Sequence, residues 1–387
     1  MISQKTKLGD VCTIKTGKLD SNAAVEGGKY PFFTCAQETF AIDKYAYDTE
    51  AVLLGGNNAN GIFPLKYYHG KFNAYQRTYI IESKSDQVAL NRYLYFFLRP
   101  VLDYFKNASI GAATQYLTKP VLVNLKIDLP DVDSQKKIID IAYSYDDLIN
   151  INRRRIQLLE ETARLIFREW FVYFRFPGYE KVKIVDGVPE GWERIKFKEI
   201  IDTIESGGRP KGGAIEEGIP SIGAENVNGI GKYDYSSEKY VPEEYYHNMK
   251  KGKVMSKDVL LYKDGANIGR VTIVGHGFPH NKCCVNEHVF ILRTKNNIQN
   301  WLYFFLSQEF VQQAVANLNS NSAQPGISQE KLSGLKIIFP SRKIVRLFDV
   351  MAEDMVRQIF MLSIQNQKLA QARDLLLPRL MSGKIEV

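Results

Sequence analysis

The chain has 387 residues, which is long for one hydrophobic core, so two or more domains are expected. Its composition, 45% hydrophobic and 24% charged, is typical of a globular protein and excludes the disordered and collagen-like classes. No apolar run approaches the roughly 18 residues that a membrane-spanning helix needs, and no apolar leader follows Met1, so we expect a cytoplasmic protein with no membrane partner. The excess of 51 Lys and Arg over 43 Asp and Glu permits a polyanionic partner without proving one.

The first 130 residues alternate short strands with turns and one aromatic segment. An apolar strand at residues 52–54 runs into a turn rich in Gly and Asn, and residues 78–81 alternate like a second strand. Residues 93–98 read YLYFFL, and residues 125–130 read LKIDLP. Mixed strands and helices of this kind predict an α+β module. The aromatic segment is interpreted as a core helix rather than a base-stacking surface.

A long helix is expected after Pro130. Apolar residues from Ala142 to Trp170 recur in a strict four-three alternation, which is the seam of a coiled coil. Asn152 lies on that seam, where a polar side chain lowers stability but fixes register. At 1.5 Å per residue such a helix is roughly 60 Å long, so it needs a partner along its length.

The second half of the chain repeats the first. Residues 301–306 read WLYFFL, identical to residues 93–98 at five of six positions, and residues 335–340 read LKIIFP. An offset of about 208 residues indicates two whole domains rather than a solenoid of short repeats. A second four-three alternation runs from Phe348 to Leu376 and places Gln358, Gln365 and Ala372 on its seam.

Together these patterns predict an α+β protein with a pseudo-two-fold internal repeat. Two similar α/β domains are separated by two long helices that pack as an antiparallel coiled coil, with one domain at each end. The expected boundaries are residues 1–130 for the first domain, 131–176 for the central helix, 177–191 for a linker, 192–340 for the second domain and 341–387 for the distal helix.

At this point the chain resembles the specificity subunits of type I restriction-modification systems. The resemblance rests on the duplicated order of module and helix, on residues 152–156 and 167–171 of the first helix, on the linker 188–192 (VPEGW) and on the C-terminal residues 375–385 (LLLPRLMSGKI). It implies two target-recognition domains, each of which reads half of a bipartite site in double-stranded DNA. It also implies two modification subunits that methylate adenine with S-adenosylmethionine, and restriction subunits that use ATP and Mg²⁺.

The motifs that would make this chain itself an enzyme are missing from the sequence. It contains no Asn-Pro-Pro-Tyr motif for amino methylation, no Gly-x-Gly-x-x-Gly turn and no Walker A loop. We therefore expect a non-catalytic DNA-recognition subunit with no cofactor of its own.

Small loops that bear amide side chains are the predicted base contacts, because such loops approach base edges closely and an amide can pair with adenine in two places. The DNA-binding candidates are Gly55, Gly56, Asn57, Asn58, Asn60, Gln76, Arg77, Thr114, Gln115, Lys263, Asp264, Asn267, Asn281, Lys282, Asn321 and Gln324. The predicted phosphate contacts are Lys66, Lys71, Lys119, Arg209, Lys211 and Arg270. Turn formation explains many of these residues without DNA, and helix capping explains Thr118 and Ser328.

Two other classes of function stay open at this stage. His276, His280, Cys283, Cys284 and His288 are clustered in sequence, and zinc prefers such ligands, so a metal-dependent hydrolase is one alternative. The spacing favours instead a loop entering a half-buried strand, on which the adjacent cysteines point to opposite faces. A purely architectural coiled-coil scaffold is the other alternative.

Overall fold

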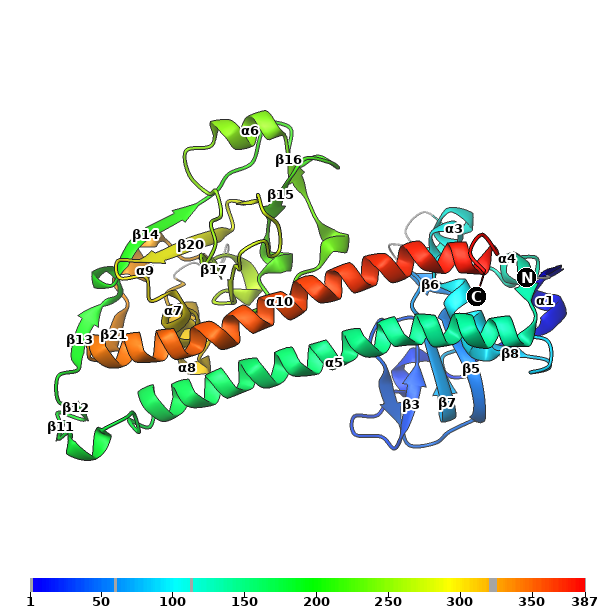
Figure 1. Cartoon of the computed structure of the whole chain (residues 1–387), viewed down its shortest axis with the longest axis horizontal. Helices are drawn as coiled ribbons and strands as arrows, with labels where there is room; N and C mark the ends of the chain where they lie inside the picture. Colours follow the sequence, from blue (N-terminus) through cyan, green and yellow to red (C-terminus); the bar gives the residue numbers. More distant parts are fainter. Residues whose placement is uncertain (1–2, 59–60, 112–113, 320–325, 387) are drawn as a thin grey trace. The chain divides into compact units, whose positions relative to one another are not determined.

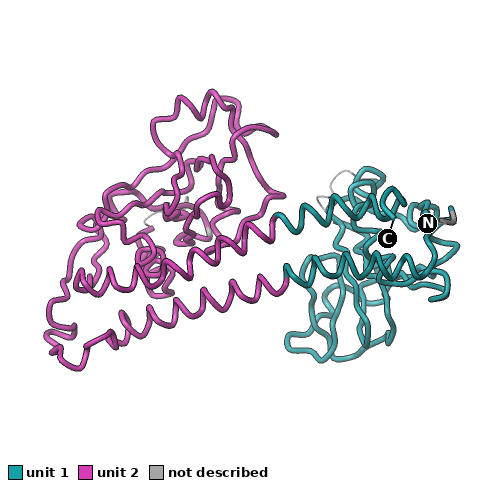
Figure 2. Tube along the Cα trace, viewed as in Figure 1, with its two compact units in different colours: residues 1–149, 368–387 teal, residues 150–367 magenta. Residues whose placement is uncertain are grey.

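The computed structural model describes residues 3–58, 61–111, 114–319 and 326–386 (Figure 1). The chain divides into two compact units (Figure 2). Unit 1 comprises residues 1–149 and 368–387, and unit 2 comprises residues 150–367. Within the described ranges, no helix combines the length and the apolar character needed to cross a membrane.

Unit 1 is built on a six-stranded sheet with the strand order β2-β8-β5-β7-β3-β4. Its strands are β2 (Cys12–Thr16), β8 (Thr78–Ser83), β5 (Tyr47–Gly55), β7 (Leu65–Ala74), β3 (Tyr30–Phe33) and β4 (Phe40–Ile42). All neighbours are antiparallel except β3 and β7. The central strand β5 is buried from Ala51 to Gly55, as expected for the apolar run predicted there.

Short helices and two small strand pairs complete unit 1. The helices are α1 (Leu8–Val11), α2 (Asn91–Leu98), α3 (Leu102–Ala108) and α4 (Lys119–Val123). Strand β1 (Ser3–Lys7) pairs antiparallel with β10 (Lys126–Pro130), so the start of the module is joined to its last strand. The two-residue strands β6 (Asn57–Asn58) and β9 (Gln115–Tyr116) pair antiparallel, which joins the segment after β5 to the segment before α4.

Unit 2 contains a four-stranded sheet with the order β14-β20-β17-β18 and a three-stranded sheet with the order β16-β15-β19. The first consists of β14 (Ile201–Ser206), β20 (Val289–Thr294), β17 (Val259–Tyr262) and β18 (Val271–Ile273), and the second of β16 (Tyr240–Val241), β15 (Ile219–Ile222) and β19 (Cys284–Val285). The helices are α6 (Glu243–Asn248), α7 (Gln299–Leu306), α8 (Glu309–Ala316) and α9 (Gln329–Ser333). Strand β13 (Glu193–Lys196) pairs antiparallel with β21 (Lys336–Phe339).

The two units share one topology, which confirms the predicted internal repeat. The order β14-β20-β17-β18 in unit 2 matches β2-β8-β5-β7 in unit 1, and the pair β13–β21 matches β1–β10. Even the first turn is repeated. The backbone N–H of Leu8 donates to the Leu125 carbonyl at 2.8 Å, and that of Phe197 donates to the Leu335 carbonyl at 2.8 Å.

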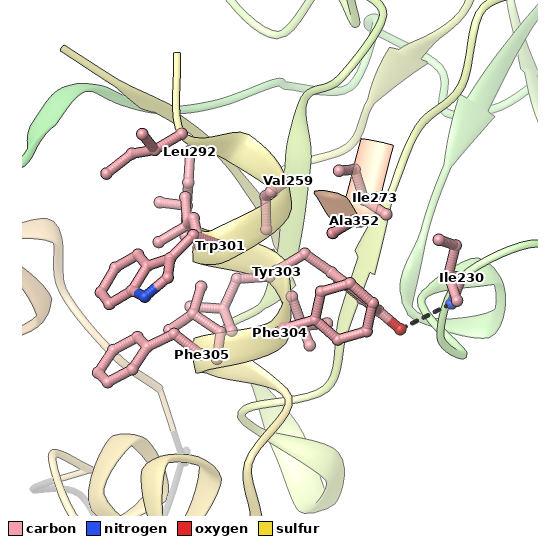
Figure 3. Packing of buried hydrophobic residues seen from close by; sticks show 14 of the residues in the cluster. Ile230, Val259, Ile273, Leu292, Trp301, Tyr303, Phe304, Phe305 and Ala352 are labelled. Atoms are coloured by element: carbon pink, nitrogen blue, oxygen red, sulfur yellow. Dashed lines mark hydrogen bonds between the residues drawn. The ribbon is translucent and has the colours of Figure 1, made fainter. Parts of the chain in front are cut away.

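The aromatic segments form core helices in both units, as predicted. In α2, Tyr93, Leu94, Phe96 and Leu98 are buried, and every residue of α7 is buried. Figure 3 shows α7 packed against strands of unit 2, with the Tyr303 hydroxyl accepting a hydrogen bond from the Ile230 N–H at 3.0 Å. These aromatic rings are not available for stacking on bases.

The two long helices are α5 (Val132–Phe171) and α10 (Arg342–Met381). In unit 1 the early residues of α5 share a core with the late residues of α10, including Ala142 and Leu377. In unit 2 the later part of α5 shares a core with the early part of α10, including Ala163 and Phe348. Earlier parts of one helix therefore meet later parts of the other, which is the predicted antiparallel pairing.

The predicted seam on α5 is confirmed, whereas three predicted seam residues of α10 are exposed. These are Gln358, Gln365 and Ala372, of which Gln365 still contacts α5, while Ala352, Val356 and Ile359 are buried. The reason is that α10 in unit 2 contacts the globular module as well as α5. A Cβ atom on Gly275 would lie 2.4 Å from the Phe360 ring, so the core-facing surface of the helix is broader than a two-helix seam.

The segment between α5 and β13 makes its own small core. It contains the one-turn 3₁₀ helix η2 (Tyr179–Lys181) and the short antiparallel pair of β11 (Ile184–Val185) and β12 (Val188–Pro189). Phe176, Val188 and Trp192 are buried with Ile344 of α10. The linker predicted at 177–191 is therefore ordered.

Candidate nucleic-acid interface

In unit 1, three segments that contain predicted DNA-binding residues come together where β5 ends. The Gly56 N–H donates to the Arg77 carbonyl at 2.7 Å, and the Leu117 N–H donates to the Gly56 carbonyl at 2.9 Å. Asn57 and Asn58 pair in antiparallel register with Tyr116 and Gln115. The candidates at 57–58, 76–77 and 114–115 thus belong to one surface, Gly55 and Gly56 are buried beneath it, and Asn60 lies outside the described residues.

The two glycines beneath this surface are required by packing. A Cβ atom on Gly56 would lie 2.5 Å from the Arg77 carbonyl oxygen, and one on Gly55 would lie 2.7 Å from Cδ of Pro64. The Arg77 backbone therefore explains Gly56, and the Pro64 ring explains Gly55. Their presence gives no separate support for a close approach of DNA.

The side chains around these glycines form defined contacts. The Arg77 guanidinium lies over the Tyr116 ring, 5.1 Å from its centroid, and both residues are exposed. The Gln115 amide donates from Nε2 to the Gly111 carbonyl at 2.7 Å, and its Oε1 accepts from the Ser109 hydroxyl at 2.8 Å. Gln115 therefore bonds to both Ser109 and Gly111, and a base contact would have to replace these bonds. Thr114 is half-buried beside it.

Unit 2 repeats the same backbone framework with different residues. The Lys263 N–H donates to the His288 carbonyl at 3.1 Å, and the Ile327 N–H donates to the Lys263 carbonyl at 3.0 Å. Asp264 forms a β-bridge with Gly326. Lys263 therefore occupies the place of Gly56, and His288 occupies the place of Arg77. Asn321 and Gln324 lie outside the described residues.

A chain of acidic and basic side chains, which we call the charge chain, runs across this part of unit 2 with His288 between two carboxylates. The Asp264 Oδ2 atom lies 2.9 Å from Lys263 Nζ and 2.8 Å from His288 Nδ1. His288 Nε2 lies 3.2 Å from Glu287 Oε1, which in turn lies 2.7 Å from Arg209 Nε. All five side chains keep part of their surface in solvent, so the charge chain is accessible.

Other candidates of unit 2 lie apart from this bonded framework or at its edge. Asn267 ends the short 3₁₀ helix η6 (Gly265–Asn267) and is exposed. Asn281 and Lys282 are exposed on a separate loop. That loop is anchored by the His280 ring, which is paired with Glu238, and by the Tyr235 hydroxyl, which donates to the Pro279 carbonyl at 3.4 Å.

The predicted phosphate contacts differ in whether their charged groups already bond to other groups of the protein. Lys66 is half-buried and donates from Nζ to the carbonyls of Ala36, at 3.2 Å, and Glu38, at 2.6 Å. Burial lowers the pKa of this ammonium. Arg209 is paired with Glu287, and Arg270 donates to Asn228 Oδ1 at 3.1 Å. The remaining three, Lys71, Lys119 and Lys211, have exposed side chains.

One of the two predicted helix caps is wrong. Ser328 accepts at Oγ from the Lys331 N–H at 3.2 Å, as expected for the N-cap of α9. Thr118 makes no side-chain cap bond at the start of α4. Pro120 there lacks an N–H, and the Val121 N–H already donates to the Thr118 carbonyl at 3.1 Å.

The histidines and cysteines that suggested a hydrolase have separate partners. His280 pairs with Glu238 and His288 with Asp264, whereas His276 is exposed. Burial raises the pKa of the Cys283 thiol to about 12, so this residue is a neutral core side chain. Across the part of the chain that the structure describes, no three His, Cys, Asp or Glu side chains are grouped so that they could hold a metal ion.

Comparison with known proteins agrees with this architecture. The family model of the type I restriction modification DNA specificity domain matches residues 3–161 and 189–354, one copy in each half of the chain. The chain belongs to this family, which confirms the resemblance found in the sequence.

Three relatives illustrate the extent of the similarity. The chain is 41% identical over 219 residues to the EcoDI specificity subunit of Escherichia coli, an alignment that covers 51% of this chain and 48% of that relative. It is 24% identical over 342 residues to the MjaVIII specificity subunit of Methanocaldococcus jannaschii, covering 87% and 79% of the two chains. The S subunit from M. genitalium has the same fold, with a TM-score of 0.61, 14% identity and coverage of 98% and 96%.

Sequence reasoning missed Glu287 and His288 as members of the candidate surface. The sequence assigns His288 only to the histidine and cysteine cluster and does not single out Glu287, although the two precede strand 289–292 as Gln76 and Arg77 precede strand 78–81. Carrying the internal repeat through to these positions would have identified them.

Proposed function

We propose that this chain is the DNA-recognition subunit of a type I restriction-modification complex, and that each unit reads one half of a bipartite target. The observation that carries the proposal is the repeated framework. In both units the same backbone hydrogen bonds hold the residue that follows the equivalent sheet strand. This residue is Gly56 after β5 in unit 1 and Lys263 after β17 in unit 2. A scaffold that is repeated while its surface residues change is suited to reading two different sequences.

The two surfaces differ in charge. Unit 1 presents Asn57, Asn58 and the cation Arg77, whereas unit 2 presents Asp264 and Glu287 among cations. Amides and guanidinium groups pair with adenine and guanine edges, while a carboxylate accepts from an amino group. We therefore expect the two half-sites to differ in sequence.

The chain would direct chemistry that other subunits perform. Two modification subunits would methylate adenine with S-adenosylmethionine, and restriction subunits would translocate and cut DNA with ATP and Mg²⁺. The absence of the corresponding motifs from the sequence supports a non-catalytic role for this chain, with no cofactor of its own. The family membership of both halves supports the same assignment.

Exchange of one module tests the proposal. Residues 192–340 would be replaced with the equivalent module of a relative, and the methylated motif would be read by sequencing the genome of cells that express the complex. Only one half of the motif should change. A change in both halves, or loss of the unaltered half, would show that the units do not read independently. Binding that does not depend on DNA sequence would favour an architectural scaffold.

A further inference from the structure

Unit 2 carries a carboxylate, that of Asp264, on the surface proposed to face DNA. The negative charge of DNA alone would disfavour an acidic residue at this place. Asp264 replaces Asn57 at the same place in the repeated framework, because the residue before each is held by equivalent backbone bonds. A carboxylate close to a polyanion is repelled unless cations compensate it or it accepts a hydrogen bond from a base. Lys263 and Arg209 supply such cations on either side.

His288 determines where this carboxylate points. Its Nδ1 lies 2.8 Å from Asp264 Oδ2, and because an ionised carboxylate can only accept, the imidazole is the donor. The His288 backbone is itself fixed, since its carbonyl accepts from the Lys263 N–H and its own N–H donates to Asn286 Oδ1 at 2.9 Å. The ring is also held on its other side, where Nε2 lies 3.2 Å from Glu287 Oε1.

The two oxygens of Asp264 are used unequally. The bonds from Lys263 and from His288 both go to Oδ2, and no hydrogen bond or ion pair among the described residues uses Oδ1. The side chain keeps 26% of its surface exposed. Oδ1 is therefore the atom that is left to accept from a ligand outside the chain.

Resting on the proposed function, we propose that Asp264 is the base-reading group of unit 2, that it selects a base with an exocyclic amino group, adenine or cytosine, and that His288 is the positioning residue that aims it. In the major groove these are the bases that present an amino donor, whereas guanine and thymine present carbonyl acceptors that repel a carboxylate. Unit 1, with Asn57 and Arg77 at the equivalent places, has no such restriction. The Asp264 carboxylate would then make unit 2 selective mainly by rejecting guanine and thymine, which present a carbonyl oxygen in the major groove.

The test uses the full chain assembled with its modification subunits and a library of duplexes that is randomised across both half-sites. In Asp264→Ala and in His288→Ala, the preference for adenine or cytosine at one shared position of one half-site should fall roughly tenfold, since a good base contact discriminates by about that much or more. His288→Asn should restore part of the preference, because its amide can donate from a place near Nδ1. The other half-site should be unchanged.

His276→Ala is the matched control, because this histidine is exposed and lies outside the charge chain. If the wild-type complex selects no motif, the proposed function itself fails. If it selects a motif but His288→Ala leaves every position unaltered, or weakens all duplexes equally, the inference is overturned while the proposed function stands. Thermal melting of each variant separates a loss of selectivity from a loss of folding. If His288→Ala melts early, the comparison of Asp264→Ala with wild type carries the test.

Discussion

Asn152 of α5 donates from Nδ2 to Oε1 of Gln365 of α10 at 3.1 Å. The same amide also donates to Oδ1 of Asn366 at 3.0 Å. Asn152 is 1% exposed and lies on the α5 seam between the buried apolar residues Ile149 and Ile156. A buried amide that bonds only to the opposite helix favours one register, because any slip would leave it without a partner.

Asn152→Ala should therefore lower the free energy of unfolding by about 1–2 kcal/mol, since two hydrogen bonds are lost and their partners lie near solvent. Chemical denaturation followed by circular dichroism measures this. Asn150→Ala is the control, because Asn150 is exposed on the same helix. Equal effects of the two substitutions would contradict a register-fixing role for Asn152.

A second prediction concerns Asp349 of α10, whose carboxylate holds the start of α7. Its Oδ1 accepts from the Trp301 N–H at 2.9 Å, and burial raises the pKa of this carboxyl to about 6. The charged form is thus disfavoured in the folded protein relative to the unfolded chain. Stability should rise by about 1 kcal/mol as the pH falls from 7 to 5, because the group becomes protonated in the folded state first.

Asp349→Asn should remove this part of the pH dependence and raise the melting temperature at pH 7, since an amide oxygen can still accept from Trp301. Melting curves at several pH values measure both effects. Asp354→Asn is the control on the same helix, where the carboxylate is exposed and pairs with Arg357 at the surface. A pH profile that is identical in wild type and Asp349→Asn would refute the assignment.

A third prediction separates two lysines that the sequence treats alike. Lys66 is bonded to two carbonyls, whereas the ammonium of Lys71 lies at the surface over the Tyr45 ring, 4.8 Å from its centroid. Lys71→Ala should weaken binding to all DNA sequences about equally and reduce the salt slope by about one. Lys66→Ala should lower thermal stability instead. Titrations at several salt concentrations, together with melting curves, distinguish the two.

The features that sequence could predict are those that repeat or that follow one period. The duplicated module, the core helix at residues 301–306 and the seam on α5 each reflect many residues acting in the same way. The face of α10 could not be predicted from its heptads, because it packs on two neighbours and Ile359 is buried where Gln358 was expected.

Individual site residues were harder to assign. The loop segments predicted in unit 1 do lie together, since glycine and amide residues occur where strands end and loops fold back. The partners of each side chain depend on contacts distant in sequence. Lys66 meets the carbonyls of residues 36 and 38, and Asp264 meets His288, and neither pairing leaves a local pattern.

The long helices give a fourth prediction, about the spacer between half-sites. Residues 132–149 of α5 belong to unit 1 and residues 150–171 to unit 2, so the helix continues from one unit into the other. Deleting one heptad from α5 alone would break its pairing with α10. Deleting residues 150–156 together with residues 361–367 removes about 10 Å from both helices and keeps the heptad phase.

The double deletion should shorten the spacer of the methylated motif by about three base pairs, since DNA rises 3.4 Å per pair on each strand. The bases of the two half-sites should stay the same. The single deletion of residues 150–156 is the control and should abolish activity. An active double-deletion complex with an unaltered spacer would show that the helices do not set the spacing.

The last prediction asks whether the loops of unit 1 read bases. In Gln115→Ala combined with Asn58→Ala, two amides are removed from paired positions of β9 and β6. Loss of an amide contact with a base costs about 1–3 kcal/mol against the preferred base, whereas loss of a phosphate contact weakens every sequence alike. The double variant should therefore relax the first half-site and leave the second unchanged.

Ser109→Ala is the control for that experiment, because it removes the hydroxyl that donates to Gln115 Oε1 and leaves the amide in place. If Gln115 reads a base, Ser109→Ala should keep the base preference and alter only affinity. If Gln115 merely holds the 109–115 loop closed, both variants should weaken all duplexes to a similar extent. Binding of the assembled complex to single-position variants of the target duplex, at two salt concentrations, decides between these outcomes, and a uniform loss would assign Gln115 a structural role.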